Sequence, residues 1–181
     1  MHGLIFTSFR DYLTEAFGTE VSASVFADEP IYLLSEAYPD ERLQGLVARA
    51  RERTGRDVDA LMYDFGVFTA ASTFARLYPA LFAIAGSPRD FLLTVEERIH
   101  ELVRATIPNA GPPQLDVSEL DDDGVSILYT SPRRLCTLLR GLTEGTARHY
   151  GERSEIEERT CMRRGDPACT FAVRFARGQR A

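Results

Sequence analysis

The sequence contains no lysine, and no apolar stretch is long enough to cross a membrane. Its amino terminus also has no basic region leading into the apolar stretch of a secretory signal. Acidic residues number 27 against 21 arginines, which leaves a net charge of −6 at pH 7. Because phosphate binding needs a basic surface, no nucleic acid partner is expected. No membrane association is expected either, and we predict a cytoplasmic location.

Cysteine is also scarce. Three cysteines are an odd number for a disulfide framework, which indicates a reducing compartment or a bound metal. The 181 residues suffice for one domain with its own core, and 44% of them are hydrophobic, with eleven phenylalanines and seven tyrosines. A large apolar pocket is therefore feasible. No arrangement of nucleophile and base typical of an enzyme is recognisable.

The first half of the chain has apolar residues at helical spacing, in the segments 13–25, 43–50 and 58–71. Gly55 is expected to end the second of these helices, and Asp57 to cap the third.

Two prolines mark further helix starts. Pro79 predicts a short helix that runs to Ala85. The segment Ser87-Pro88-Arg89-Asp90 combines a cap, a first-turn proline and an acid at the capping-box position, and it predicts the start of the helix that carries His100.

Beyond Pro108 the periodicity changes to that of strands. An acidic turn at 121–124 joins the first two as a hairpin, and a helix over 134–149 is inserted before the third. The predicted strands are 114–117, 125–130, 154–160 and 170–175. Helices followed by such a sheet predict an α+β fold: an N-terminal helical part, then a four-stranded antiparallel sheet with an inserted helix.

His100 falls on the shoulder of the apolar stripe of the segment 92–103. From there its ring can face an interior cavity and offer a nitrogen to a metal. Taken alone, a partly buried histidine bonded to a backbone carbonyl is the commoner explanation. His2 and His149 do not share the pattern and are expected at the surface.

The run Tyr129-Thr130-Ser131-Pro132-Arg133 carries a phenol, a hydroxyl and a guanidinium at alternate positions. Alternate residues of an extended backbone share a face, so we expect the three side chains to point the same way. Together they suit a planar acid with carboxylate groups. Taken singly, a tyrosine or arginine near a strand end more often covers the core and meets solvent.

In order and spacing, His100, Pro108, Pro112-Pro113 and the Tyr-x-Ser-x-Arg run resemble haem nitric oxide/oxygen binding (H-NOX) domains. The opening five residues and the segment 15–18, which is similar to the family's first helix end, extend the resemblance.

The resemblance covers roughly residues 1 to 175. It implies a single sensor domain over 1–181, with a distal helical part over 1–60 and a proximal helix-and-sheet part over 61–181.

The family's cofactor is haem b, and the resemblance assigns it an axial ligand, three propionate-binding side chains and two residues that pack on opposite faces of the porphyrin. The implied axial ligand is His100. The implied propionate-binding residues are Tyr129, Ser131 and Arg133, and the residues implied to pack on the two faces are Pro113 and Ile5.

Oxygen-binding members of the family place a distal tyrosine on the helix after the Tyr-x-Ser-x-Arg run. Here the nearby residues include Leu138, and no tyrosine occurs before Tyr150. Nitric oxide binds ferrous haem without a distal donor, so we predict a nitric oxide sensor with carbon monoxide as a weaker ligand. Tyr63 or Tyr78 entering the pocket from another helix would change this prediction.

By family analogy, nitric oxide weakens the bond from the iron to His100, the haem relaxes against Pro113, and the helix carrying His100 shifts. The sequence has no recognisable kinase, cyclase or methyl-accepting segment. We therefore expect a separate partner, either a histidine kinase or a cyclic-dinucleotide enzyme.

The cysteines form a second candidate site. A turn at 165–167 can bring Cys161 and Cys169 together, and Glu158 and Cys136 complete a tetrahedral set for zinc. This part also resembles four-vinyl reductase-like domains, which hold zinc with a similar cysteine pattern. His149 is a reserve ligand, and ordinary core and hairpin cysteines are the alternative.

Two other functions stay open. One is a haem-free module of the four-vinyl reductase type that binds a small apolar molecule. The other is a zinc-thiolate redox sensor to which haem is secondary.

Overall fold

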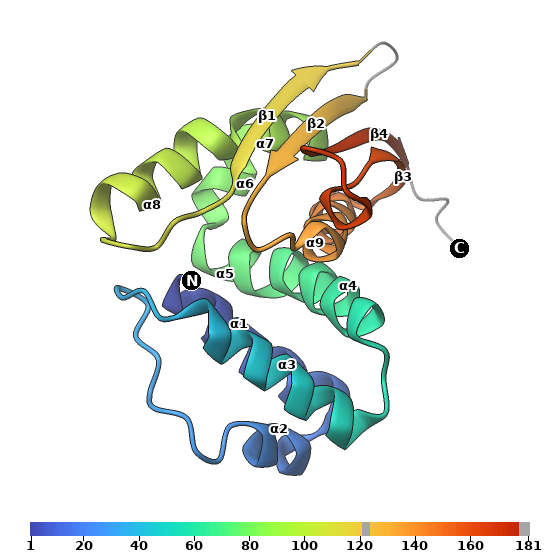
Figure 1. The fold of residues 1–181 in the computed structure, drawn as a ribbon. Helices are drawn as coiled ribbons and strands as arrows, with labels where there is room; N and C mark the ends of the chain where they lie inside the picture. Colours follow the sequence, from blue (N-terminus) through green and yellow to red (C-terminus); the bar gives the residue numbers. More distant parts are fainter. Residues whose placement is uncertain (121–123, 178–181) are drawn as a thin grey trace.

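Helices occupy most of the chain up to residue 106 in the computed structural model, which describes residues 1–120 and 124–177 (Figure 1). Gly18, at φ +88°, separates the first two helices, and Gly55, at φ +68°, ends the third. Both positive φ angles favour glycine. These helices are α1 (Gly3–Phe17), α2 (Thr19–Val25) and α3 (Asp40–Thr54).

The next helix begins where its cap predicts, because the Asp57 side chain accepts hydrogen bonds from the backbone N–H groups of Asp59 and Ala60. It continues through a π-helical segment, and Pro79 starts the following helix as expected. The elements are α4 (Val58–Phe68), η1 (Thr69–Phe74), α5 (Ala75–Leu77) and α6 (Pro79–Ala85).

The helix that carries His100 is confirmed, including its N-cap at Ser87, although the Asp90 carboxylate accepts from the Ser87 hydroxyl and not from the Ser87 backbone N–H that a capping box would use. The Ser87 hydroxyl accepts from the Asp90 N–H at 3.0 Å and donates to the Asp90 carboxylate at 2.8 Å. A π-helical segment interrupts the middle of the helix, and such segments are frequent at functional sites. The three parts are α7 (Pro88–Val95), η2 (Glu96–His100) and α8 (Glu101–Thr106).

The second half forms the predicted four-stranded antiparallel sheet, in the order β1-β2-β4-β3, so the α+β class is confirmed. The predicted turn at 121–124 falls largely on 121–123, outside the described residues. Across it, the Leu120 N–H donates to the Gly124 carbonyl at 3.0 Å. The elements are β1 (Gln114–Glu119), β2 (Val125–Thr130), α9 (Cys136–His149), β3 (Glu152–Thr160), η3 (Met162–Arg164) and β4 (Cys169–Arg177).

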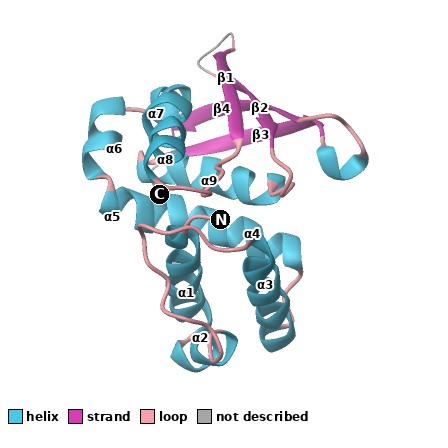
Figure 2. Cartoon of the chain, turned by 60° about the vertical axis from the view of Figure 1, so that its left-hand side comes forward, coloured by secondary structure: helices cyan, strands magenta, loops and turns pink. Residues whose placement is uncertain are grey.

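Figure 2 shows helices α1, α2 and α3 at one end of the molecule and the sheet at the other. Two hydrophobic clusters organise the interior. The first joins α1, α2, α3 and α4 around aromatic side chains such as Phe9 and Phe65. The second lies between the sheet and the helices α7 and α9, with Leu92, Ile127 and Phe171 at its centre. The division of the chain at residue 60 stays a prediction.

Helices α4 and α9 approach closely enough to require glycine. A Cβ atom on Gly141 would lie 2.1 Å from the Tyr63 carbonyl oxygen, and one on Gly145 would lie 2.3 Å from that of Val67. Because this contact joins the helical part to the sheet-bearing part, the glycines fix how the two meet.

Within the described residues, no single helix is long and apolar enough to span a membrane. One sharply bent pair, Val58–Leu77 with Pro79–Ala85, passes by length and composition.

Candidate functional site

His100 stands at the end of η2 with its ring largely buried; its side chain is 16% exposed. Its Nδ1 atom lies 2.9 Å from a carboxylate oxygen of Glu96. A carboxylate can only accept when ionised, so Nδ1 carries the proton and Nε2 is the nitrogen free to bind a metal.

Two opposing effects act on this pair. Burial lowers the pKa of His100, and the Glu96 carboxylate offsets only part of that effect. Burial by itself raises the pKa of Glu96, but hydrogen bonds from His100, Arg104 and the Leu115 N–H outweigh it and hold that pKa below its ordinary value. Near neutral pH the pair therefore consists of a neutral imidazole and a carboxylate.

Glu96 and Arg104 also tie this helix to the start of the sheet. The Leu115 N–H donates to Glu96 at 3.1 Å, and Arg104 donates to the Pro113 carbonyl at 3.3 Å while pairing with Glu96. The loop between α8 and β1 is thus fastened to the helix that carries His100.

Arg133 holds the same loop from the other side. Its guanidinium donates to the carbonyls of Gly111 and Ala110, the latter at 3.5 Å, and its Nε donates to Asp40 at 2.7 Å. Arg104, one turn beyond His100 on the same helix, and Arg133 therefore both contact the loop that contains Pro113.

The prediction that Tyr129, Ser131 and Arg133 share one strand face is wrong, because β2 ends at Thr130. Only Tyr129 lies in the strand. Ser131 and Arg133 belong to the following turn, where the Ser131 hydroxyl accepts from the Arg133 N–H at 3.3 Å and Arg134 has a φ of +50°. A turn, not an extended backbone, directs these side chains.

Tyr129 is buried, and its hydroxyl accepts from the Leu135 N–H at 3.0 Å. Burial raises the pKa of Tyr129, and the Ser131 hydroxyl and the Leu135 N–H offset part of that rise. The phenol therefore stays neutral and remains available as a donor.

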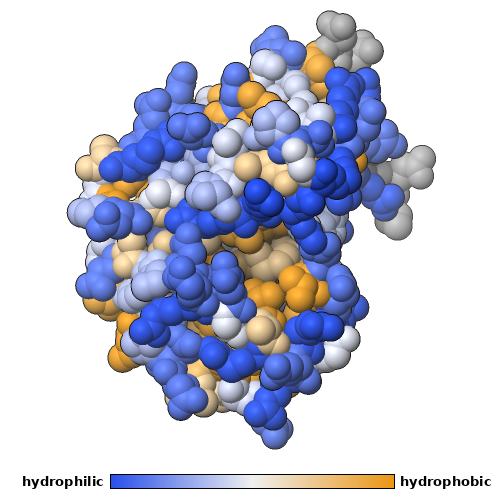
Figure 3. Space-filling model, in the orientation of Figure 1, coloured by the Kyte–Doolittle hydropathy of each residue, from blue (hydrophilic) through white to orange (hydrophobic). Residues whose placement is uncertain are grey.

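A cavity of about 440 Å³ opens beside Arg133, between the first residues, the segment 37–41 and Asn109. Asp40 and Glu41 line it, so a bound carboxylate would meet two like charges as well as the guanidinium. Figure 3 shows apolar side chains at the bottom of a hollow between the N-terminal helices and the sheet-bearing part.

The donor set fits a haem. A histidine that gives its Nδ1 proton to a carboxylate is the usual arrangement of a metal-binding imidazole. Arg133 supplies a guanidinium for propionates, provided that it exchanges its contact with Asp40 for one with the ligand.

The residues implied for the two faces of the porphyrin come from different parts of the structure. Ile5 lies on α1 and packs against the first cluster, and Pro113 immediately precedes β1. Leu138 is buried in the first cluster, Tyr63 is half-buried on α4, and Tyr78 is 40% exposed. The apolar side chain of Leu138 therefore lies in the interior of the molecule.

The four residues predicted for zinc converge. The ligand atoms of Cys136, Glu158, Cys161 and Cys169 all lie within 4.8 Å of one another. The Sγ atoms of Cys136 and Cys161 are 3.7 Å apart, too far for a disulfide at about 2.0 Å. Tetrahedral zinc with bonds of about 2.3 Å would place two sulfurs about 3.8 Å apart, which matches.

The turn that closes this cluster is the predicted one. Gly165 has a φ of +98°, and the Asp166 carboxylate accepts from the Cys161 N–H at 2.7 Å. The Met162 N–H lies 3.2 Å from the Cys169 sulfur and donates to it. Burial, with the neighbouring thiols, raises the pKa of Cys136 to about 12 and that of Cys169 above its ordinary value. In the metal-free cluster these two thiols are therefore protonated.

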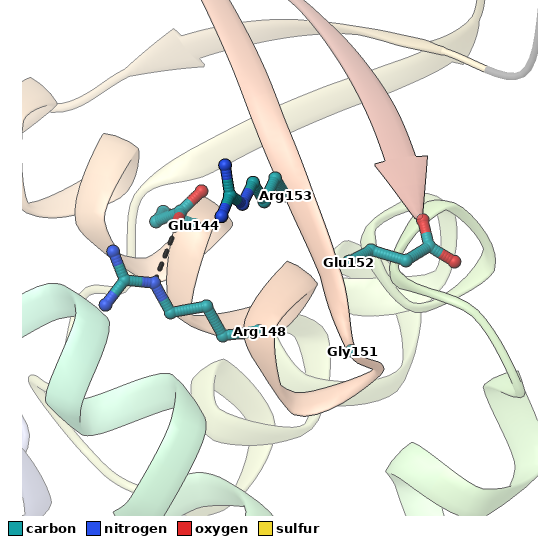
Figure 4. Close-up of a pocket in the computed structure, with 5 residues that line it drawn as sticks. All are labelled: Glu144, Arg148, Gly151, Glu152 and Arg153. Carbon is teal, nitrogen blue, oxygen red and sulfur yellow. Dashed lines mark hydrogen bonds and ion pairs between the residues drawn. The ribbon is translucent and has the colours of Figure 1, made fainter. Parts of the chain in front are cut away.

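A second cavity, of about 520 Å³, lies where α9 meets β3 (Figure 4). Its central group is Glu144, which is nearly buried and accepts from Arg148 at 2.7 Å and from the N–H and hydroxyl of Ser154 at 3.1 and 2.7 Å. Arg153 lies on the other side of this carboxylate, and Glu152 points away. With all these bonds inside the protein, Glu144 joins the helix to the strand.

The other histidines differ from expectation in part. His149 is exposed as predicted, and its ring packs on Phe82 with centroids 4.5 Å apart, outside the cysteine cluster. His2 is not a simple surface residue, because it is half-buried and its Nδ1 accepts from the Leu4 N–H at the start of α1.

Sequence reasoning missed two partners of the site. Glu96 had a signal, since it precedes His100 by one helical turn. Asp40 had none, because its contact with Arg133 joins residues far apart in the chain.

Comparison with known proteins gives the following similarities. The family profile described as Haem-NO-binding matches residues 2–158. Soluble guanylate cyclases 89Db and 89Da of Drosophila melanogaster are 26% and 25% identical over alignments of 167 positions, which cover 83% of this chain. The match spans 24% of the length of each cyclase.

Solved structures share the fold. An H-NOX protein from S. oneidensis in the Fe(II)NO ligation state has a TM-score of 0.88 at 22% identity, over 97% of this chain and 99% of that chain. The Fe(II) unliganded H-NOX protein from K. algicida has a TM-score of 0.82 at 24% identity over the whole of both chains.

Proposed function

The chain belongs to the haem-NO-binding (H-NOX) family, whose domains are haem-based gas sensors and not enzymes, and we propose that here His100 binds the iron of a ferrous haem b that senses nitric oxide. The observation that carries the proposal is the hydrogen bond from His100 Nδ1 to Glu96, which leaves Nε2 for the metal. Haem, when bound, supplies an iron with an open position for a diatomic gas.

The other residues have distinct roles in this proposal. Arg133 gives charge-assisted contacts to the propionates, and Tyr129 and Ser131 give neutral ones. Pro113 and Ile5 pack on opposite faces of the ring. The support is the arrangement around the loop before β1, which Arg104 holds on one side and Arg133 on the other.

The experiment is replacement of the proposed ligand. The parent purified from haem-supplemented cells should be red with a strong Soret band, and His100→Gly should lose haem unless imidazole is added. His149→Gly, which changes an exposed histidine, should keep the parent spectrum. Full haem retention with an unchanged spectrum in His100→Gly would refute the assignment, and a colourless parent would favour a haem-free binding module.

The preference for nitric oxide rests on the absence of a tyrosine at position 138. Leu138 is buried among apolar groups, so oxygen would find no hydrogen-bond donor there. The ferrous protein should bind nitric oxide and carbon monoxide, and it should form no stable oxygen complex during brief exposure to air. A persistent oxy-haem spectrum would mean that Tyr63, Tyr78 or another donor reaches the gas.

The signal leaves through the helix over 88–106. Once the constraint on His100 is released, this helix can shift, and Glu96 and Arg104 transmit the shift to the start of β1. The receiver is a separate partner, a histidine kinase or a cyclic-dinucleotide enzyme. Amide hydrogen exchange over 96–119 should change when nitric oxide is added and should stay constant in His100→Gly loaded with imidazole and haem.

A second cofactor is favoured by the sulfur geometry. We propose zinc bound by Cys136, Cys161, Cys169 and Glu158, which would tie the start of α9 to the turn before β4. Glu158 pairs with Arg164 at 3.1 Å, so it must exchange that contact to bind the metal.

Metal analysis of protein made without a polyhistidine tag tests this site. About one zinc per chain is expected in the parent and little in Cys161→Ser. If the reduced parent is free of metal and equally stable with a strong chelator, the cysteines are ordinary core residues, and neither a structural nor a redox-sensing zinc role remains.

A further inference from the structure

Glu96 is the group on which the polar contacts around His100 converge. We propose that Glu96 is a positioning residue that orients His100 and sets how strongly it binds iron, with Arg104 acting in opposition. This inference rests on the proposed role of His100 as the ligand.

The geometry gives each carboxylate oxygen a separate task. Oε2 accepts from His100 Nδ1 at 2.9 Å and from the Leu115 N–H at 3.1 Å, while Oε1 pairs with Arg104. The backbone N–H of Leu115 belongs to β1, so the carboxylate has a fixed anchor in the sheet. The His100 ring is thereby held in one tautomer and one orientation.

Burial makes these contacts effective. The side chains of His100 and Glu96 are 16% and 23% exposed, and that of Arg104 is 36% exposed. A carboxylate that accepts the Nδ1 proton pushes electron density toward Nε2 and makes it a stronger donor to a metal. Arg104 draws on the same carboxylate and weakens that effect.

The backbone supports the same arrangement. Glu96 and His100 are the first and last residues of η2, and the N–H of Glu101 donates to the Glu96 carbonyl. The π-helical turn therefore begins and ends on the interacting pair. This is the segment where a local change in helical pitch would alter the distance between carboxylate and imidazole.

Substitutions of the acid Glu96 and of the cation Arg104 should have effects of opposite sign. In Glu96→Gln the amide still accepts a hydrogen bond but carries no charge, so the iron–histidine stretching band of the ferrous protein should move to lower frequency. In Arg104→Gln the carboxylate is freed from its competing partner, and the band should move to higher frequency. A residue with a merely structural role would not produce shifts of opposite sign.

The test is resonance Raman spectroscopy of ferrous haem-loaded protein, with haem transfer to apomyoglobin as a second readout. Glu96→Gln should release haem about 10-fold faster than the parent, as expected when the outer partner of a metal ligand is lost. Glu96→Asp should restore part of the band position. Glu97→Gln is the matched control, because it makes the same chemical change at an exposed neighbour.

The outcomes separate the two proposals. If the iron–histidine band persists in His100→Gly without imidazole, His100 is not the ligand and the proposed function fails. If that band disappears in His100→Gly but stays at the parent frequency in both Glu96→Gln and Arg104→Gln, His100 is the ligand and the role of Glu96 is refuted.

Discussion

Replacement of Arg133 by glutamine tests how the helical part is fastened to the loop before β1. The parent guanidinium bridges Asp40, at the start of α3, and the carbonyls of Ala110 and Gly111. Glutamine is shorter and neutral, so it cannot span these partners. The change removes the bridge but leaves the Ser131 hydroxyl in contact with the backbone N–H of residue 133.

The expected loss of stability in Arg133→Gln depends on how exposed the Arg133–Asp40 ion pair is. Hydrogen bonds to a charged group contribute about 1.5–3 kcal/mol each when well buried. Asp40 is 33% exposed and also accepts from the Met1 amino group at 2.9 Å, so water and that amine replace much of the lost contact with Arg133. The contribution of these hydrogen bonds is therefore reduced toward that of an exposed ion pair, and we expect a loss of about 1–2 kcal/mol in the free energy of unfolding.

Thermal and urea unfolding of the haem-free protein at pH 7 measure this loss. For a domain of this size it corresponds to a fall of roughly 2–8 °C in Tm. Arg134→Gln is the control, since Arg134 is exposed and should change stability by no more than about 0.5 kcal/mol. Equal stability of the two variants would refute the bridging role.

A double-mutant cycle with Asp40→Asn extends the experiment to the haem-loaded protein. The coupling energy between Arg133 and Asp40 should be positive without haem and should fall when haem is bound, because propionates would compete for the guanidinium. An unchanged coupling would mean that Arg133 does not turn to the cofactor.

Two further predictions concern stability. Gly141→Ala should cost about 2–3 kcal/mol in the free energy of unfolding, measured by urea titration, because its Cβ would lie 2.1 Å from the Tyr63 carbonyl oxygen. Gly45→Ala is the control and should be neutral or stabilising, because its Cβ would meet nothing closer than 3.6 Å. A similar cost in both variants would contradict the close-packing argument. Burial by itself raises the pKa of Glu144, but hydrogen bonds from Ser154 and Arg148 outweigh burial and leave that pKa below its ordinary value of 4.5. The charge of Glu144 therefore stabilises the fold above pH 4.5, and this stabilisation is lost as the pH falls through the lowered pKa. Glu144→Gln should therefore lower stability by about 1 kcal/mol at pH 7 and by less at pH 3, and a pH-independent difference would disprove the role of the charge.

Local chemistry in the sequence determined several element boundaries. The capping groups of Asp57 and Ser87 and the positive φ at Gly55 act within a few residues, and each helix begins or ends where they predict. The strand periodicity likewise predicted β2 over its full length. Such signals are legible because their energies depend on neighbours in the chain.

The cysteine cluster was predictable in part from local sequence signals and depended in part on tertiary packing. Spacing around the turn at 165–167 predicted that Cys161 and Cys169 would meet, since a reversal of the chain brings flanking residues together. Whether Cys136 joined them depended on how α9 packs on the sheet. The 3.7 Å separation of its sulfur from that of Cys161 is a property of that packing.

The contacts of Ser131 and Arg133 were not predictable from the sequence pattern. Sequence periodicity placed Ser131 and Arg133 on a strand face, whereas the strand ends at Thr130 and a turn directs both side chains. Likewise, no local pattern marks Asp40 as the partner of Arg133, because an ion pair between distant segments has no periodicity. Sequence by itself thus predicted which residues carry the chemistry, and the packing of helices against the sheet decided which of their atoms meet.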